Sequence, residues 1–284
     1  MTARLSAEQV KQYRASGIVF PLTAFDEEGA GALLNKFEQL EQREGGRISP
    51  GTNRKPHLLV PWLSELIRSP SILDAVEDVL GPNLLCWGSQ FFPKAPRDPG
   101  FISWHQDATY WGLSTADVLT VWLALTPSNV ANGCMRVVPG THLSQVEHRD
   151  TEDGANMLSR GQEISVNVRE EDAVDVVLRP GEFSMHNVLL FHGSKPNSAD
   201  YRRVGYAIRY IPTHVRQTVA SADSATLVRG VDTYGHFEHE AAPKSEFDAD
   251  AIEQHRRAVD GARRSLLLRD AKGTGVSAAS GTGA

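Results

Sequence analysis

The chain has 284 residues, 40% of them hydrophobic, and a formal net charge of −6 at pH 7. This length is sufficient to bury a large core within one domain. The acidic balance gives no electrostatic support for binding nucleic acid or an anionic membrane surface, because the basic residues at 256–264 are interleaved with acids. No apolar run approaches the 18 residues of a transmembrane helix, so we expect no membrane span.

The amino-terminal sequence and the cysteines bear on location. The start, MTARLSAEQV, lacks the apolar segment of a secretory signal. The two cysteines, Cys86 and Cys134, are too few for a disulfide framework and stand in apolar, strand-like contexts. We therefore predict a reduced, cytoplasmic protein.

The first third of the chain carries helix signals. Ser6 and Gln9 form a capping-box pattern, and Gly17 ends the helix that they begin. Apolar spacing predicts a second helix over 26–42. A third helix is predicted over 69–81, because Ser69 and Pro70 are typical of a helix start and Gly81 of a helix end. Helical periodicity returns at 249–268.

The middle of the chain is rich in β-forming residues separated by turn sequences such as ANG, RPGE and GSKPNSAD. Many short strands of this kind indicate a sandwich or barrel. We expect one β-core domain with helices packed outside it over residues 1–270, and a small, polar, disordered tail over 271–284. The predicted strands are 84–92, 118–124, 135–138, 174–178, 183–191 and 204–211.

The segment ISWHQDATYWGL, residues 102–113, is the first candidate for chemistry. A carboxylate among aromatic residues is costly unless a cation compensates it. If 102–110 is a strand, alternation places His105 and Asp107 on one face and Gln106 on the other. His105 and Asp107 would then supply two ligands of a metal site.

A third ligand is expected from the segment SMHNVLLFHGSKPN. It offers His186 and His192, whose six-residue separation gives them the same face of a continuous strand. The context favours His192, which stands beside Gly193, where backbone can approach closely. Two histidines and one carboxylate are typical of non-haem Fe(II) oxygenases, with positions open for O2 and a bidentate cosubstrate such as a 2-oxo acid.

A 2-oxo dicarboxylic acid also needs a cation for its far carboxylate. The segment YRRVGYAIRY supplies Arg203, eleven residues after His192, and Arg209 on the same strand face. A guanidinium can donate two parallel hydrogen bonds to one carboxylate. Arg203 is our first choice for this role and Arg209 the second.

The motifs WHQD at 104, NGCMRVVPGTH at 132 and FHGSKPN followed by RR at 202 resemble those of the phytanoyl-CoA dioxygenase family of Fe(II)/2-oxoglutarate oxygenases. The resemblance runs from about residue 5 to 215 and implies a double-stranded β-helix, a cupin-like jelly-roll barrel. It implies iron ligation by His105, Asp107 and His192. It further implies binding of the cosubstrate by four residues: Arg203, Ser194, Trp122 and Gln90.

The resemblance implies that Fe(II), 2-oxoglutarate and O2 are used to hydroxylate an unactivated C–H bond, releasing succinate and CO2. Asp107 favours hydroxylation over halogenation, since related halogenases carry a small residue there. We find no basic patch near the motifs for the phosphates of coenzyme A. The sequence therefore favours a small polar substrate, such as an amino acid, an aminoalkylphosphonate or a natural-product intermediate.

Two alternatives stay open, an oxygenase of acyl-CoA or carrier-tethered thioesters and a non-catalytic cupin-like binding protein. The oligomeric state is open as well. Desaturation, epoxidation or cyclisation by the same centre is also compatible with the motifs. The candidates for substrate contact are His57, Tyr110, Trp111 and Arg209.

Overall fold

The computed structural model describes residues 5–272 except 152, 159, 160 and 221, without the side chains of Tyr110 and of 262–272. Of the tail predicted over 271–284, the first two residues end the last helix and 273–284 lie outside the described residues. The helices are α1 (Ala7–Ser16), α2 (Glu27–Arg43), α3 (Pro61–Leu66), α4 (Pro70–Leu80), α5 (Ala108–Trp111) and α6 (Ala249–Lys272).

The predicted helix boundaries agree with the structure within one or two residues over the first third of the chain. Ser6 and Gln9 form both hydrogen bonds of the capping box of α1, and Gly17 ends that helix with a φ of 77°. Asp26 caps α2 by accepting from the Gly29 amide. Local side-chain chemistry therefore fixes where these helices begin.

Two main sheets and one short hairpin make up the β structure, with short 3-10 turns at 56–58, 141–143 and 170–172. All neighbouring strands are antiparallel except β12 and β13. The strand order of the large sheet is β1 (Ile18–Thr23), β9 (Glu182–Asn187), β4 (Leu119–Ala124), β11 (Gly205–Pro212), β2 (Leu84–Phe91), β12 (Ser224–Arg229) and β13 (Glu238–His239). The strand order of the small sheet is β3 (Ile102–His105), β10 (Phe191–Ser194), β5 (Met135–Val138) and β8 (Val174–Asp175). The hairpin consists of β6 (His148–Arg149) and β7 (Glu163–Ile164).

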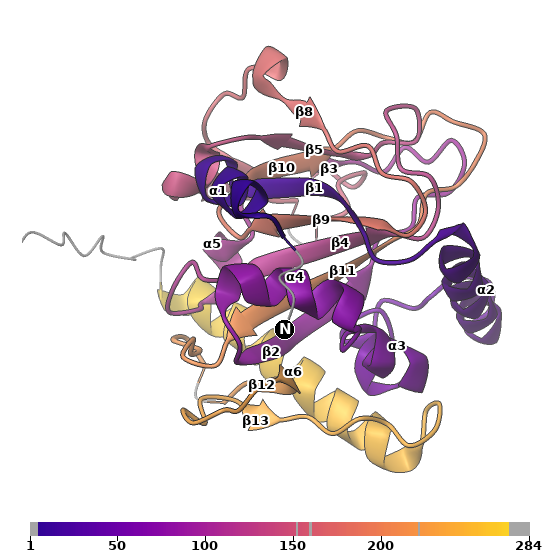
Figure 1. Cartoon of the computed structure of the whole chain (residues 1–284), viewed down its shortest axis with the longest axis vertical. Coiled ribbons are helices and arrows are strands. Elements are labelled where there is room, and N and C mark those ends of the chain that lie inside the picture. The colour runs from indigo at the N-terminus through magenta and orange to yellow at the C-terminus, as the bar shows by residue number, and fades with distance from the viewer. Residues whose placement is uncertain (1–4, 152, 159–160, 221, 273–284) are drawn as a thin grey trace, which may run out of the picture.

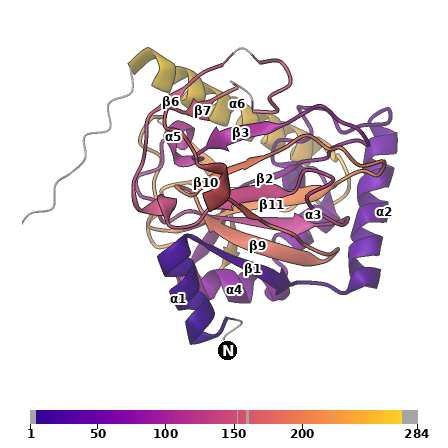
Figure 2. The same cartoon turned by 90° about the horizontal axis from the view of Figure 1, so that it is seen from above.

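The two main sheets face one another, with the small sheet above the large one in Figure 1 and in front of it in Figure 2. Alternation along β4 divides its side chains between two environments. Leu119, Val121 and Leu123 pack into the core formed with α2, α3 and α4, while Thr120 and Trp122 face the space between the sheets. This arrangement is the mainly β, jelly-roll architecture that the sequence predicts.

The strand predicted over 183–191 is in fact two strands in different sheets. β9 ends at Asn187 in the large sheet, the chain turns over 188–190, and β10 begins at Phe191 in the small sheet. The Leu190 amide donates to the Asn187 carbonyl and closes this turn. The apolar run VLLF looks like continuous strand because three of its four residues are buried and Leu189 is partly buried, although the run spans the turn.

The strand predicted over 102–110 is also shorter than expected. β3 ends at His105, and Asp107 has helical backbone angles, φ −64° and ψ −37°, at the start of α5. Strand alternation is therefore not the reason that the side chains of His105 and Asp107 share one side. The turn into α5 brings them together instead.

The carboxy-terminal part of the chain is tied to the segment before α3 by buried polar contacts. The Lys55 ammonium donates to the Glu240 carboxylate at 2.6 Å, and the His57 ring lies 3.6 Å from the same carboxylate. On the surface side, the His255 ring donates to the Arg54 carbonyl at 2.6 Å. The segment 54–57 therefore depends on residues almost two hundred positions further along.

Within the described residues, none of the helices combines the length and the apolar character that crossing a membrane would require.

We predict that Glu240→Ala lowers the free energy of unfolding by about 3–5 kcal/mol, because it leaves the buried Lys55 ammonium without its counter-ion. The matched control is Glu246→Ala, which removes the exposed ion pair with Arg43 and is expected to cost about 0–1 kcal/mol. Urea unfolding followed by circular dichroism measures both values. Equal effects of the two substitutions would contradict the structural role of Glu240.

Candidate metal centre and its cavity

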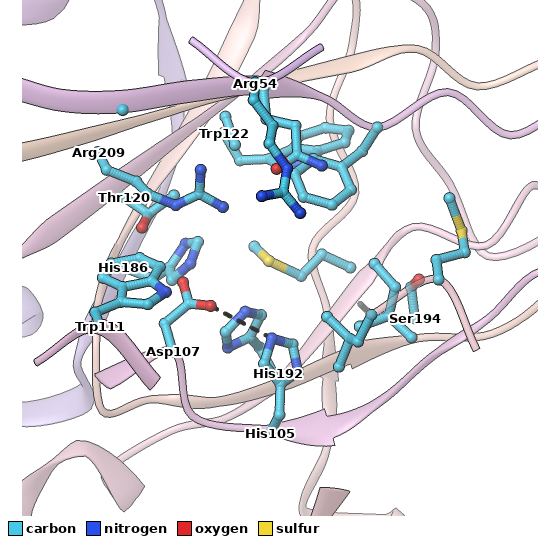
Figure 3. Close-up of a pocket in the computed structure, with 18 of the residues that line it drawn as sticks. Arg54, His105, Asp107, Trp111, Thr120, Trp122, His186, His192, Ser194 and Arg209 are labelled. Atoms are coloured by element: carbon cyan, nitrogen blue, oxygen red, sulfur yellow. Dashed lines mark ion pairs between the residues drawn. The ribbon is translucent and has the colours of Figure 1, made fainter. Parts of the chain in front are cut away.

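Three potential metal ligands converge between the sheets. The nearest ligand atoms of His105, Asp107 and His192 all lie within 4.8 Å of one another, and Figure 3 shows the three side chains directed to one point. His105 on β3 is the direct cross-strand neighbour of His192 on β10. The sheet register thus brings together the two histidines, and the turn after β3 adds the carboxylate.

Main-chain carbonyls fix which nitrogen each histidine offers. Nδ1 of His105 lies 2.9 Å from the Ser103 carbonyl, and Nδ1 of His192 lies 2.9 Å from the Leu190 carbonyl. A carbonyl only accepts, so each Nδ1 carries the proton and each Nε2 keeps a lone pair for a metal. Burial lowers the pKa of His192 well below its ordinary value, which keeps that ring neutral.

Asp107 stays ionised in this setting. Burial by itself would raise the pKa of its carboxyl group, but the facing ring of His105 and the positive charge of Arg209 lower it. Two imidazoles and one carboxylate on one side of an ion suit Fe(II) with further positions open.

Gln106, between the two ligands, holds the turn in place. Its fully buried amide donates to the carbonyls of Ser144 and Leu189 at 2.8 and 2.6 Å and accepts from the Val146 amide at 2.9 Å. Strand alternation predicts only that Gln106 faces away from the two ligands, and this role was not predicted from the sequence. The clue in the sequence was its place inside the motif, but its partners lie 38 to 83 residues away.

His186, the alternative third ligand, lies beside the triad and outside it. Its ring centre is 4.9 Å from that of His192, and burial lowers its pKa to about 4. Neither ring nitrogen has a hydrogen-bond partner. His186 belongs to β9 in the large sheet, across the cavity from β10. The six-residue separation from His192 therefore does not place the two rings on one strand face.

Arg203 lies at the other side of the cavity, buried to 2% exposure. Its Nη1 donates to the Gly133 carbonyl, its Nε has no partner, and its guanidinium lies 5.3 Å from the centre of the Trp122 ring. The Trp122 ring can lie there because Gly205 has no side chain: a Cβ at that position would be 1.9 Å from the ring.

A second buried cation, Lys94, accompanies Arg203 and was not anticipated from the sequence. Its ammonium is fully buried and donates to the Ser194 hydroxyl at 2.8 Å. Burial, followed by the charge of Arg203, lowers the pKa of Lys94 to about 7. Neither cation forms an ion pair with a carboxylate of the described part of the chain, so an anion from outside would complete this end of the cavity.

The cavity that joins the triad, His186 and Arg203 has a volume of about 300 Å³, and Lys94 lies behind its wall. Of the other predicted site residues, Gln90, Trp111, Ser194 and Arg209 line it. The side chain of Tyr110 lies outside the described part of the structure.

The expectation of a substrate contact at His57 is corrected. His57 is fully buried behind the cavity wall, where its Nδ1 lies 2.6 Å from the Ser89 hydroxyl and its Nε2 faces Glu240. The carboxylate draws this ring inward. The neighbouring residues Arg54 and Lys55 line the cavity instead.

Comparison with known proteins gives a consistent picture. The family model described as phytanoyl-CoA dioxygenase matches residues 5–205. The chain is 27% identical over 253 residues to a probable alpha-ketoglutarate-dependent hypophosphite dioxygenase of Stutzerimonas stutzeri, covering 82% of this chain and 84% of that protein.

Solved structures extend the likeness to the whole fold. The non-heme monooxygenase ThoJ is 36% identical, with a TM-score of 0.81 over 91% of this chain and 97% of that one. CytC3, solved with Fe(II) and alpha-ketoglutarate, is 28% identical, with a TM-score of 0.63 over 87% of this chain and 98% of that one.

We predict that Gln106→Leu keeps the fold but weakens Fe(II) binding by about 10- to 100-fold, as is usual when a group that orients a metal ligand is removed. Anaerobic equilibrium dialysis measures the dissociation constant. The control is Gln254→Leu, which removes two amide hydrogen bonds to Ala241 on the outer side of α6 and should leave metal binding unchanged. Unchanged Fe(II) affinity in Gln106→Leu would refute the positioning role.

Proposed function

This chain belongs to the phytanoyl-CoA dioxygenase family, and we propose that it hydroxylates a C–H bond of a small polar molecule with Fe(II), 2-oxoglutarate and O2. Succinate and CO2 are the products formed from the cosubstrate. In this proposal Fe(II) is held by His105, Asp107 and His192. Their convergence within 4.8 Å and the lone pairs left on the two Nε2 atoms support the assignment.

The observation that carries the proposal is the buried Arg203 guanidinium, which lines the same cavity as the triad and has no counter-ion among the described residues, with the Lys94 ammonium held behind it on Ser194. We assign Arg203, Lys94 and Ser194 to the C5 carboxylate of 2-oxoglutarate, with Trp122 and Gln90 as walls. A carboxylate placed there would satisfy the unpartnered Nε of Arg203 and the charge of Lys94. The 2-oxo acid group at its other end would then point toward the triad.

The bound iron and cosubstrate supply the oxidising power that activates O2 for attack on a C–H bond. The residues of the chain bind and orient the reactants and keep bulk water from the centre. The aromatic side chains Trp87, Trp111 and Trp122 line much of the apolar wall.

The volume of the cavity bears on the substrate. At about 300 Å³ it lies at the lower end of the range for small-molecule pockets and must also contain the cosubstrate. This favours a small free molecule over an acyl thioester of coenzyme A. We further propose a cytoplasmic location, supported by two buried, unpaired cysteines, and no nucleic-acid partner, in line with the acidic net charge.

Anaerobic titration with Fe(II) and 2-oxoglutarate tests the function. We expect the visible charge-transfer band of the chelated cosubstrate in the wild type, its loss in Asp107→Ala and His192→Ala, and at least tenfold weaker 2-oxoglutarate binding in Arg203→Met. His186→Ala is the matched control and should keep the band, because this histidine lies outside the triad. A wild type without the band, or a band that depends on His186, would overturn the assignment.

The pH dependence of 2-oxoglutarate binding tests Lys94 separately. Because the pKa of Lys94 is about 7 before an anion binds, binding above that pH must take up a proton. The dissociation constant is therefore expected to rise between about pH 7 and 8.5, by up to about tenfold per pH unit. In Lys94→Met we expect weaker binding at about pH 6.5 and loss of this dependence. A wild-type constant that is flat or falls with pH would contradict the proposal.

A further inference from the structure

A row of polar side chains crosses the large sheet on the cavity side, away from Arg203. His186 on β9 pairs with Thr120 on β4, and Thr120 pairs with Arg209 on β11. Gly88 on β2 extends the row and leaves open space beside the Arg209 side chain. All four residues line the cavity, and Figure 3 shows the three side chains next to one another.

Several buried polar atoms of this row have no hydrogen-bond partner among the described residues. Both ring nitrogens of His186, Oγ1 of Thr120 and Nε of Arg209 are buried and unpartnered, and His186 and Thr120 are only 2% and 3% exposed. Buried polar groups in native proteins are nearly always paired. Several unpaired groups side by side, facing one cavity, therefore indicate a site for a polar ligand.

The charge of Arg209 has no counter-ion in the assembled centre. In the proposed complex, Asp107 and the two carboxylates of 2-oxoglutarate are already matched by the charges of the iron, Arg203 and Lys94, so none of these anions is left for Arg209. Arg209 forms no ion pair among the described residues, and its guanidinium lies 5.0 Å from the centre of the Trp111 ring. Trp111 in turn packs on Trp87 at 5.1 Å, which shields the guanidinium from water.

Arg209 and Arg203 cannot bind the same anion. They are six residues apart on one extended segment, which separates their backbones by about 20 Å at the usual strand rise. Arg203 lies beside Lys94, whose ammonium donates to Ser194, and Figure 3 shows Ser194 and Arg209 at opposite sides of the cavity, with Arg209 near Trp111 and Asp107. Each end of the cavity therefore has its own cation.

A second guanidinium reaches the cavity from its rim. Figure 3 shows the Arg54 side chain directed into the cavity. Its position is fixed from behind, because the His255 ring donates to the Arg54 carbonyl and the Lys55–Glu240 ion pair holds the next residue. Lys55 has a left-handed backbone, φ 51°, which only such contacts maintain.

We propose that the substrate is a small acid whose oxyanion group, a carboxylate or a phosphonate, is bound by Arg209 and Thr120, with His186 completing the row and Arg54 closing over it. This places the acid group beside the metal centre and the C–H bond to be oxidised within a few bonds of it. The inference rests on the proposed function, since it assigns the substrate end of that same cavity.

The test uses the anaerobic complex of the protein with Fe(II) and saturating 2-oxoglutarate, so that the cosubstrate end is filled. Acetate, methylphosphonate and the neutral analogue acetamide are titrated while the charge-transfer band is followed. We expect a saturable change with at least one of the two anions and none with acetamide. Which anion binds more tightly distinguishes the carboxylate from the phosphonate.

Variants identify the residues responsible. Arg209→Met should weaken anion binding by about tenfold or more and keep the band, Arg209→Lys should restore part of the affinity, and Thr120→Val should weaken it less. The matched control is Arg14→Met on α1, which removes one exposed positive charge far from the cavity.

Three results would overturn the inference: equal responses to acetate and acetamide, unchanged anion binding in Arg209→Met, or loss of the band in that variant. The last would mean that Arg209 only positions Asp107. If the wild type forms no band, the proposed function fails by itself. Thermal-shift titration with the same anions, comparing Arg203→Met with Arg203→Met/Arg209→Met, then tests Arg209 without iron or cosubstrate.

Discussion

The direct antiparallel pairing of His105 with His192 is the contact on which the rest of the centre depends. A shift of one residue would turn one of the two imidazoles away from the cavity, because strand side chains alternate between faces. The chain secures this register by its turn at 188–190, which transfers it from the large sheet to the small one. Gly193 allows the close approach, since a Cβ there would be 2.8 Å from the Ile102 carbonyl oxygen.

The interior between the two sheets contains buried cationic side chains that have no counter-ion among the described residues. Arg203 and Lys94 at one end, and Arg209 at the other, lie where water cannot compensate them fully. A folded protein retains such groups at a cost in stability, and the cost is recovered when a ligand of opposite charge binds. In the proposed complex the cavity therefore offers a cation to an anion at each end, with the triad between them.

The sequence was sufficient to predict the fold class, the capped helices and the residues that converge at the metal centre. The prediction that His105 and Asp107 share one side is confirmed, but the reason for it was wrong, because strand alternation assumes that β3 continues past its actual end at His105. Lys94 and Gln106 could not be assigned from local sequence, since burial and distant partners define their roles. His57 was misplaced for the same reason: the Glu240 carboxylate that draws it inward lies far along the chain.

The family model covers one end of the cavity completely and the other end in part. The triad, Ser194 and Arg203 all lie within residues 5–205, where the family model matches, as do Thr120, His186 and Arg54. Arg209 lies beyond that range, as do Glu240 and His255, which hold the segment carrying Arg54. The proposed substrate end therefore depends on both parts of the chain, whereas the triad and Arg203 belong to the matched part alone. A substitution at Arg209 can alter the substrate end without replacing any member of the triad.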